Sequence, residues 1–224
     1  MEEQNNRYIS RDEINKVFSS LDGAGTVYAL KTNNGNELPD RLTEGKDIDL
    51  LVLPDDIEKL RTALEGIGFH RIAAFKGTGN GYRFAYGLIE NQIFRKNTPQ
   101  GGLYVDADFA LMCMSLQPKI WIPLDKAITR DAFANRVYNQ ELKCWELDEE
   151  TRLIYLLARC VFDKHQFTDV YIREIEKREA LMNRRSVAEK LQKVFFRFTP
   201  RLISMLNARE YQNIFNAYIT FQDY

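Results

Sequence analysis

Histidine and cysteine are scarce in this chain of 224 residues, which contains two of the former and three of the latter. The cysteines (Cys113, Cys144 and Cys160) form no Cys-x-x-Cys pair and are too few and too scattered for a disulfide framework. Together with His70 and His165 they show no spacing typical of a zinc site. The sequence therefore argues against a small disulfide-bonded protein and against a zinc-binding module. We expect the three cysteines to be small residues of the core.

Long hydrophobic runs are also missing from the sequence. No apolar stretch approaches the roughly 20 residues that span a bilayer, and residues 1–7 are polar and acidic, unlike a secretory signal. We therefore expect a protein of the reducing cytoplasm with no membrane partner. Hydrophobic residues make up 45% of the chain and charged residues 28%, a balance typical of folded globular proteins.

Net charge is close to zero, with 31 basic against 32 acidic residues and a formal charge of −1. This balance argues against a general nucleic-acid binder, because such a protein presents a positive face to phosphates. The charge is unevenly placed, however: residues 151–224 carry 13 basic and 8 acidic residues, and residues 1–150 carry the remaining 18 and 24. We therefore expect the acidic first part and the basic second part to have different electrostatic roles.

The order of predicted elements indicates an α+β fold followed by an all-helical segment. A Ser10–Glu13 capping box, in which each side chain can satisfy the other residue's backbone N–H, predicts a helix over 11–21. A second helix is expected from Pro54, and from Asp148 onward the apolar residues keep helical spacing. Strands or extended segments are predicted over 26–30, 47–53, 69–75, 82–90, 103–111 and 118–123. We expect an α+β domain over 1–135, a helical domain over 145–224, and no strand after about 145.

Two segments between the predicted strands invite a functional interpretation. The polar segment 31–46 is long for a connection inside a compact domain, and loops of that kind often carry function. The glycine-rich segment 77–81 is compatible with a phosphate-gripping loop or with a hairpin turn. We favour the turn, because no predicted helix follows it to supply N-terminal N–H groups.

The sharpest feature of the sequence is the run Lys46-Asp47-Ile48-Asp49-Leu50-Leu51-Val52. Alternate side chains of a strand share a face, so Asp47 and Asp49 point the same way while Ile48 points into the core. Two ionised carboxylates this close repel each other. A divalent cation removes that cost, since Mg²⁺ prefers oxygen ligands and needs few from the protein when a substrate phosphate supplies more.

A second acidic strand repeats this geometry. Asp106 and Asp108 share one face of the strand predicted over 103–111. If the two strands are neighbours in one sheet, three or four carboxylates converge on one point. Such a cluster suits metal-assisted phosphoryl chemistry, in which cations about 4 Å apart hold a triphosphate and activate an attacking hydroxyl. An Asp-x-Asp on a strand also has a plainer interpretation, as a pair of solvent-facing acids at a sheet edge.

The order of these elements resembles the nucleotidyltransferase superfamily with a DNA polymerase β-like core. That order is an apolar strand, a loop, an Asp-x-Asp strand, a helix and a later strand with a third acid. More narrowly, segments 28–31, 37–39 and 47–52, followed by 152–157 and 163–164, look like a little-characterised bacterial branch often encoded near polysaccharide and glycosyltransferase genes. The resemblance covers about 20–165 and is strongest over 26–53. It implies a mixed sheet with flanking helices.

The resemblance also implies roles for individual residues. Asp47 and Asp49 would be the metal pair, and Asp106 would be the third carboxylate, with Asp108 as a rival on the same face. The superfamily usually places Gly-Ser after its first strand to grip phosphates. Here that position reads Lys31-Thr32, whose ammonium and hydroxyl could replace part of that grip.

The basic residues of the helical segment have two interpretations. They could be ordinary solvated helix faces, which are usually charged, or they could form an electropositive wall for a triphosphate. Arg159 and Lys164 lie nearest the family-like stretch and are the candidates for nucleotide contact.

The function predicted from these features is transfer of a nucleoside monophosphate from an NTP such as ATP to a hydroxyl-bearing acceptor, with release of pyrophosphate. Mg²⁺ or Mn²⁺ would be the cofactor, and a small molecule or saccharide is favoured as acceptor. Two alternatives stay open. The chain could be a degenerate core that binds a nucleotide or a partner without catalysis, or an Asp-x-Asp glycosyltransferase that uses a sugar nucleotide.

Overall fold

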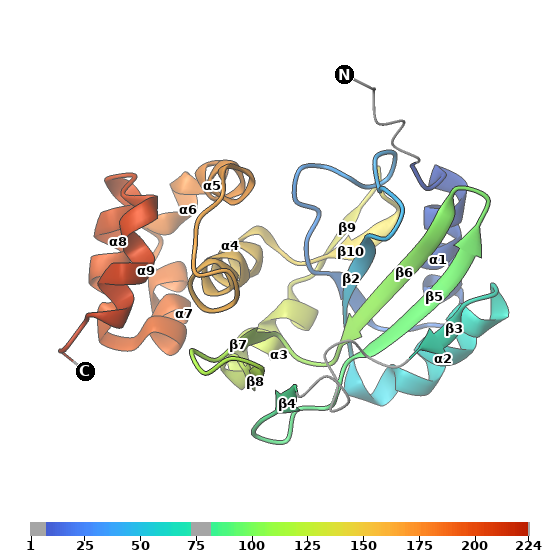
Figure 1. The fold of residues 1–224 in the computed structure, drawn as a ribbon, viewed down its shortest axis with the longest axis horizontal. Helices are drawn as coiled ribbons and strands as arrows, with labels where there is room; N and C mark the ends of the chain where they lie inside the picture. The colour runs from blue at the N-terminus through green and yellow to red at the C-terminus, as the bar shows by residue number, and fades with distance from the viewer. Residues whose placement is uncertain (1–7, 73–81, 224) are drawn as a thin grey trace.

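The computed structural model describes residues 8–72 and 82–223. Two sheets and a set of helices make up this part of the chain (Figure 1). The strands are β1 Tyr28–Leu30, β2 Asp47–Val52, β3 His70–Ile72, β4 Arg83–Phe84, β5 Gln92–Thr98, β6 Gly101–Asp108, β7 Met112–Met114, β8 Ile120–Pro123, β9 Val137–Asn139 and β10 Cys144–Glu146. The α-helices are α1 Arg11–Gly23, α2 Ile57–Gly66, α3 Lys126–Ala134, α4 Glu149–Ala158, α5 Asp169–Glu176, α6 Glu179–Met182, α7 Arg185–Phe195, α8 Thr199–Asn207 and α9 Tyr211–Ile219. Short 3-10 turns, η1 Pro54–Asp56 and η4 Phe196–Phe198, precede α2 and α8, and a π-helical turn, η3 Arg159–Asp163, follows α4.

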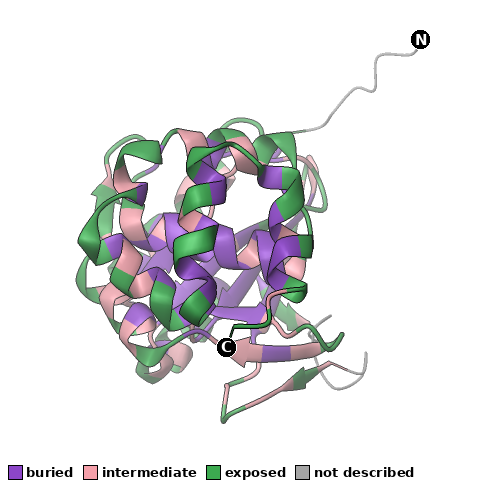
Figure 2. Cartoon of the chain, turned by 90° about the vertical axis from the view of Figure 1, so that its left-hand side faces the viewer, coloured by how far each residue is buried: buried purple, intermediate pink, exposed green. Residues whose placement is uncertain are grey.

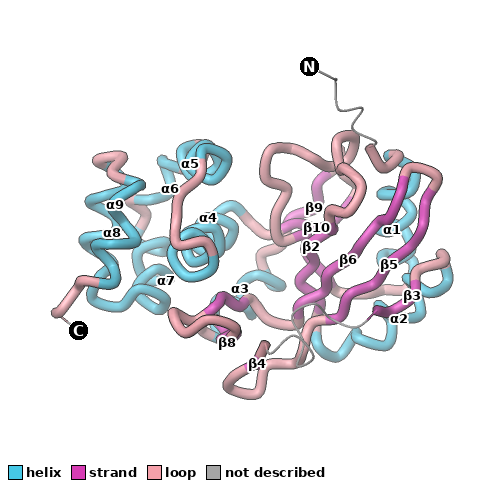
Figure 3. The backbone as a smooth tube through the Cα atoms, in the orientation of Figure 1, coloured by secondary structure: helices cyan, strands magenta, loops and turns pink. Residues whose placement is uncertain are grey.

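The main sheet has seven strands in the order β3-β5-β6-β2-β1-β10-β9 and is of mixed type. Its central pair, β2 and β6, is parallel, whereas β1 runs antiparallel to β2 and parallel to β10. A small second sheet has the order β4-β8-β7. The acidic strands are therefore neighbours in the middle of the main sheet, which Figure 3 shows as adjacent magenta segments.

Helices cover both faces of the main sheet because both faces carry apolar side chains. On one face, Ile48, Leu50 and Val52 of β2 belong to a core cluster that includes buried residues of α1 and α2. On the other face, Ala29 and Leu51 belong to a second cluster that continues into α3, α4 and the helices that follow. In Figure 2, exposed residues follow the outer surface of the C-terminal helices and buried residues lie behind them.

The α+β fold with a mixed sheet, flanking helices and a helical C-terminal part confirms the predicted fold class. The helix predicted over 11–21 is α1, and Ser10 Oγ accepts a hydrogen bond from the backbone N–H of Glu13 (3.3 Å). The second half of the predicted capping box is replaced by other contacts, because the Glu13 carboxylate pairs with Lys16 and Lys96.

Several strands differ from the prediction. The strand expected over 82–90 is only Arg83–Phe84, and the following strand, β5, forms at 92–98 instead. The short hairpin β9–β10 was not predicted, and β10 extends to Glu146, so the helical part begins at Glu149. Three-residue strands offer too few alternations to be recognised from periodicity.

The glycine-rich segment 77–81 lies outside the described residues. The strands on either side of it are β3 and β4. Their described residues belong to different sheets and do not pair with each other. Across the described residues, no helix is both long enough and apolar enough to cross a membrane.

Candidate metal centre

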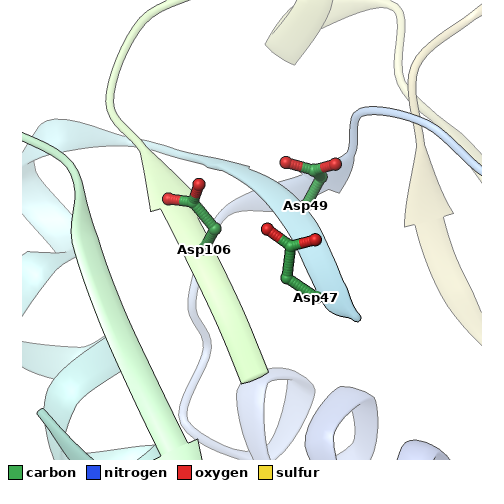
Figure 4. Close-up of side chains that lie close together, drawn as sticks. All are labelled: Asp47, Asp49 and Asp106. Carbon is green, nitrogen blue, oxygen red and sulfur yellow. The ribbon is translucent and has the colours of Figure 1, made fainter. Parts of the chain in front are cut away.

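Three carboxylates converge where β2 and β6 run side by side. Asp47 and Asp49 alternate on β2 with the buried Ile48 between them, and the parallel register pairs Asp49 with Asp106 of β6. One carboxylate oxygen from each of the three acids lies within 4.8 Å of the others. Figure 4 shows Asp47 and Asp49 projecting from one strand beside Asp106 on its neighbour. The alternation of the strand and the register of the sheet together place these three side chains on one face.

Burial increases across the cluster. Asp47 is exposed, the Asp49 side chain is 21% exposed, and Asp106 is 2% exposed. Asn91, which is fully buried, donates a hydrogen bond from Nδ2 to Asp106 Oδ1 (2.6 Å). The amide therefore orients the deepest carboxylate of the cluster, and the sequence had given no indication of this role.

Asp108 takes a different partner. Its carboxylate forms a buried ion pair with Lys31, and it lies outside the group of three converging acids. The Lys31 side chain is 1% exposed, and its Nζ is also 3.4 Å from Asp49 Oδ1. Of the two candidates for the third carboxylate, Asp106 therefore lies with Asp47 and Asp49. Asp108 is paired with Lys31 instead.

The backbone explains why Lys31 lies here. β1 pairs antiparallel with β2, and just beyond β1 the Lys31 N–H donates to the Asp49 carbonyl (2.9 Å). Lys31, Asp49 and Asp106 therefore form a row across three adjacent strands. Burial acts to lower the pKa of Lys31, but the nearby carboxylates, Asp108 foremost, outweigh it and raise that pKa well above its ordinary value. The side chain is a fixed positive charge at neutral pH.

A cavity of about 560 Å³ opens beside the acids. Its walls include Asp47, Asp49 and Thr32 on the sheet side, and Arg159 and Lys164 from the turn after α4. The volume lies within the range of ligand-binding clefts. Of the residues predicted to contact a nucleotide, Thr32, Arg159 and Lys164 line this cavity, whereas Lys31 is buried and is not among its lining residues.

The loop over 31–46 forms another wall of the cavity and is held by its own side chains. Asn33 Oδ1 accepts from the Leu38 N–H (2.9 Å), and Asn33 Nδ2 donates to the Leu38 carbonyl (3.2 Å). Thr32 Oγ1 lies 3.4 Å from Asp49 Oδ2. The long polar loop thus shapes the mouth of the centre.

Arg159 is held at the cavity by the π-helical turn η3. Its Nε pairs with Asp163 (3.3 Å), whose other oxygen accepts from the Met114 N–H (2.6 Å), and its guanidinium lies 5.8 Å from the Tyr155 ring centroid. Burial acts against the charged form, yet the neighbouring Tyr155, Asp49 and Asp163 raise the Arg159 pKa above its usual value.

Several basic residues farther along the helical part have acidic partners in the protein itself. Lys190 pairs with Glu150 (3.5 Å), Lys193 with Asp125 (3.6 Å), and Arg185 with Glu189 (2.7 Å). These contacts favour the interpretation of a charged helix surface over that of an extended phosphate-binding wall.

The donor set suits a hard divalent cation. Three carboxylates supply oxygen ligands only, and Mg²⁺ or Mn²⁺ accepts such ligands together with water and phosphate oxygens. Among the described residues, no thiol or imidazole belongs to this cluster. The cluster could therefore hold one such ion at the cavity edge.

No protein-family model and no curated protein matches the sequence. Among solved structures, the chain is similar to the antibiotic-resistance factor ANT(2'')-Ia in solution, with 11% identity, a TM-score of 0.46, and 89% of this chain and 96% of that chain covered. It is also similar to ANT(2'')-Ia in complex with adenylyl-2''-tobramycin, with 10% identity, a TM-score of 0.45, and 89% and 98% covered.

Proposed function

We propose that this protein is a metal-dependent nucleotidyltransferase that moves a nucleoside monophosphate from an NTP to a hydroxyl group. The observation that carries the proposal is the convergence of Asp47, Asp49 and Asp106 at the edge of a cavity that Arg159 and Lys164 also line. Phosphoryl transfer needs ligands for a metal ion and groups that bind phosphate oxygens. The carboxylates can supply the first and the two basic side chains the second.

Each residue has a stated part in the proposal. Asp47, Asp49 and Asp106 would hold Mg²⁺ or Mn²⁺, which would neutralise charge on the phosphates and make the acceptor hydroxyl easier to deprotonate. Arg159 and Lys164 bind the β- and γ-phosphates, and the Thr32 hydroxyl donates a hydrogen bond to a phosphate oxygen.

The reaction then follows the usual balance of phosphoryl transfer. The acceptor oxygen forms a bond to the α-phosphorus, the bond from that phosphorus to the bridging oxygen breaks, and pyrophosphate leaves. The proton of the acceptor hydroxyl passes to a carboxylate of the centre, for which we propose Asp106.

The acceptor is proposed to enter through a second cavity of about 430 Å³ that shares Asn33 and Leu38 with the first. Its walls combine amides, carboxylates and guanidinium groups, among them Asn139, Glu146 and Arg152. Such a lining offers many hydrogen bonds and little apolar area, which suits a small polyhydroxylated molecule or a saccharide.

The first test is binding of a non-hydrolysable NTP in the presence of Mg²⁺ or Mn²⁺, measured by calorimetry, followed by pyrophosphate release with a panel of hydroxyl acceptors. We expect metal-dependent binding, and we expect Asp47→Ala to abolish turnover while the far-UV circular dichroism stays unchanged. Asp55→Ala removes an exposed acid of η1 away from the cluster and is the matched control.

Other outcomes would contradict the proposal. Full turnover by the metal-replete Asp47→Ala protein would remove the acid pair from the mechanism. Failure to bind any NTP would favour a non-catalytic protein, and turnover of a sugar nucleotide without pyrophosphate release from an NTP would favour a glycosyltransferase.

A further inference from the structure

The buried pair of Lys31 and Asp108 has no part in the mechanism above. Both side chains are almost completely enclosed, with relative exposures of 1% and 3%. Removing two charges from water costs several kcal/mol each, and apolar replacements of similar volume are often equally stable. Stability alone is therefore a poor reason for a lysine at this position, and its place beside the metal ligands offers a better one.

The contacts of Asp49 show what the lysine does. The two oxygens of this carboxylate have different neighbours, since Oδ1 lies 3.4 Å from Lys31 Nζ and Oδ2 lies 3.4 Å from Thr32 Oγ1. Asp49 is also the central acid of the cluster, with Asp47 two residues before it on the same strand and Asp106 opposite it on the next.

A pair of metal ions would need Asp49 to contact both ions, and this arrangement leaves no place for the second one. Cations about 3.5–4 Å apart are held as a pair by groups that reach both ions. In the row formed by Lys31, Asp49 and Asp106, the place next to Asp49 Oδ1 already holds a positive charge, the ammonium of Lys31. A second divalent ion there would meet that charge at close range in a buried setting, where repulsion is strong.

We propose that the Lys31 ammonium is a built-in cation of this centre, which takes the place of a second metal ion beside Asp49 and restricts the centre to one divalent ion per chain. Lys31 is then a positioning residue: it fixes the Asp49 carboxylate and contributes permanent positive charge, and it need not touch the substrate. The proposal rests on the proposed function in one respect, namely that Asp47, Asp49 and Asp106 hold a metal ion.

The experiment is a titration of the metal-free protein with Mn²⁺ alone, followed by calorimetry and by electron paramagnetic resonance. We expect one Mn²⁺ per chain at this centre, counted as the binding that Asp47→Ala removes. No nucleotide or acceptor is needed, so the result does not depend on turnover.

A double variant tests the lysine itself. Lys31→Met with Asp108→Asn removes one charge of each sign at nearly constant volume, so the net charge of the protein is kept. We expect the first Mn²⁺ to bind about tenfold more tightly and a second Mn²⁺ to bind, with magnetic coupling between the two ions in the resonance spectrum. Lys59→Met with Asp56→Asn, which removes a partly buried pair outside the centre (2.7 Å), is expected to leave the titration unchanged.

The possible failures are distinguishable. Two Mn²⁺ ions per wild-type chain at this centre would overturn the proposal, whether or not the double variant folds. A folded double variant with one ion and unchanged affinity would also overturn it. Absence of any Mn²⁺ binding that depends on Asp47 would instead refute the proposed function, and the role of Lys31 with it.

Discussion

At the scale of single residues, Asn91 supports the deepest acid of the centre. Its amide donates to Asp106 Oδ1 at 2.6 Å, and both side chains are buried. Asn91→Ala leaves a buried carboxylate oxygen without this donor, and hydrogen bonds to charged groups contribute about 1.5–3 kcal/mol. We expect the free energy of unfolding to fall by about 2 kcal/mol, measured by urea denaturation at pH 7.

Asn213→Ala is the control for this substitution, because Asn213 is an exposed residue of α9. Its replacement is expected to change the unfolding free energy by less than about 0.5 kcal/mol. Equal effects of the two substitutions would show that the Asn91 amide has no special part in holding Asp106.

Glu13 gives the stability a pH dependence. Its carboxylate accepts from Lys16 Nζ (2.7 Å) and Lys96 Nζ (2.6 Å), and these hydrogen bonds lower its pKa below the ordinary value. A carboxyl with a lowered pKa stabilises the folded state above its unfolded pKa, and this contribution is lost as the pH falls through the folded pKa.

We expect Glu13→Gln to destabilise the protein by about 1 kcal/mol at pH 7, and the difference from wild type to shrink as the pH falls below about 4. Urea denaturation at pH 7 and pH 3 measures both values. Glu65→Gln, at an exposed position of α2, is the control. A difference that stays constant with pH would contradict the assigned ion pairs.

The sequence allowed the acid pair to be recognised but could not separate Asp106 from Asp108. Strand alternation puts both on one face, and only the register of β6 against β2 and the contact with Lys31 distinguish them. Lys31 and Asp108 are 77 residues apart in the chain. No local pattern reports a contact over that distance, and the same is true of the bond from Asn91 to Asp106.

At the scale of elements, α4 depends on its first residues. Asp148 caps the helix by accepting hydrogen bonds from the N–H groups of Glu150 and Thr151, both at 3.1 Å. Because α4 leads into η3, which presents Arg159 to the cavity, its N-terminus anchors one wall of the site.

Asp148→Ala removes this cap, and such substitutions cost about 0.5–2 kcal/mol. We expect a loss of about 1 kcal/mol in the free energy of unfolding, and a smaller loss for Asp148→Ser, whose hydroxyl can still accept. Thermal and urea unfolding of the two variants measure the difference. Equal losses would assign the effect to the charge of Asp148 and not to its capping bonds.

The elements that could be predicted are those with strong local signals. The capped, amphipathic helices α1 and α4 and the acidic strands β2 and β6 all lie close to their predicted positions. β5 was missed because Arg95, Lys96 and Asn97 interrupt its apolar pattern, and its main stabilisation comes from pairing with β6 and β3. Cross-strand pairing of this kind is a tertiary effect that intrinsic propensity does not report.

At the scale of the whole molecule, one hydrophobic cluster joins the sheet to the helical part. Ala29 and Leu51 of the sheet lie in the same cluster as α3, α4 and residues as late as Tyr218. Packing that continues from one part to the other favours unfolding as a single cooperative unit.

The three buried cysteines provide a test of that cooperativity. Cys113 and Cys160 belong to the cluster shared with the helices, and Cys144 belongs to the cluster on the opposite face of the sheet. Burial raises the pKa of each thiol, that of Cys160 to about 12. We expect a thiol reagent to label none of the three in the folded protein at pH 8, and all three at one common rate in moderate urea. A faster rate for Cys144 alone would show that the two clusters open separately.

The pairing of β10 with β1 also bears on how the chain folds as the ribosome makes it. β1 ends at Leu30, but its outer neighbour, β10, begins only at Cys144. Until that hairpin emerges, one edge of β1 has no strand to pair with, and open edges of this kind invite wrong partners. The acidic strands are synthesised well before the strands that complete their sheet. A nascent chain stopped at residue 135 is therefore expected to aggregate and not to form the metal centre.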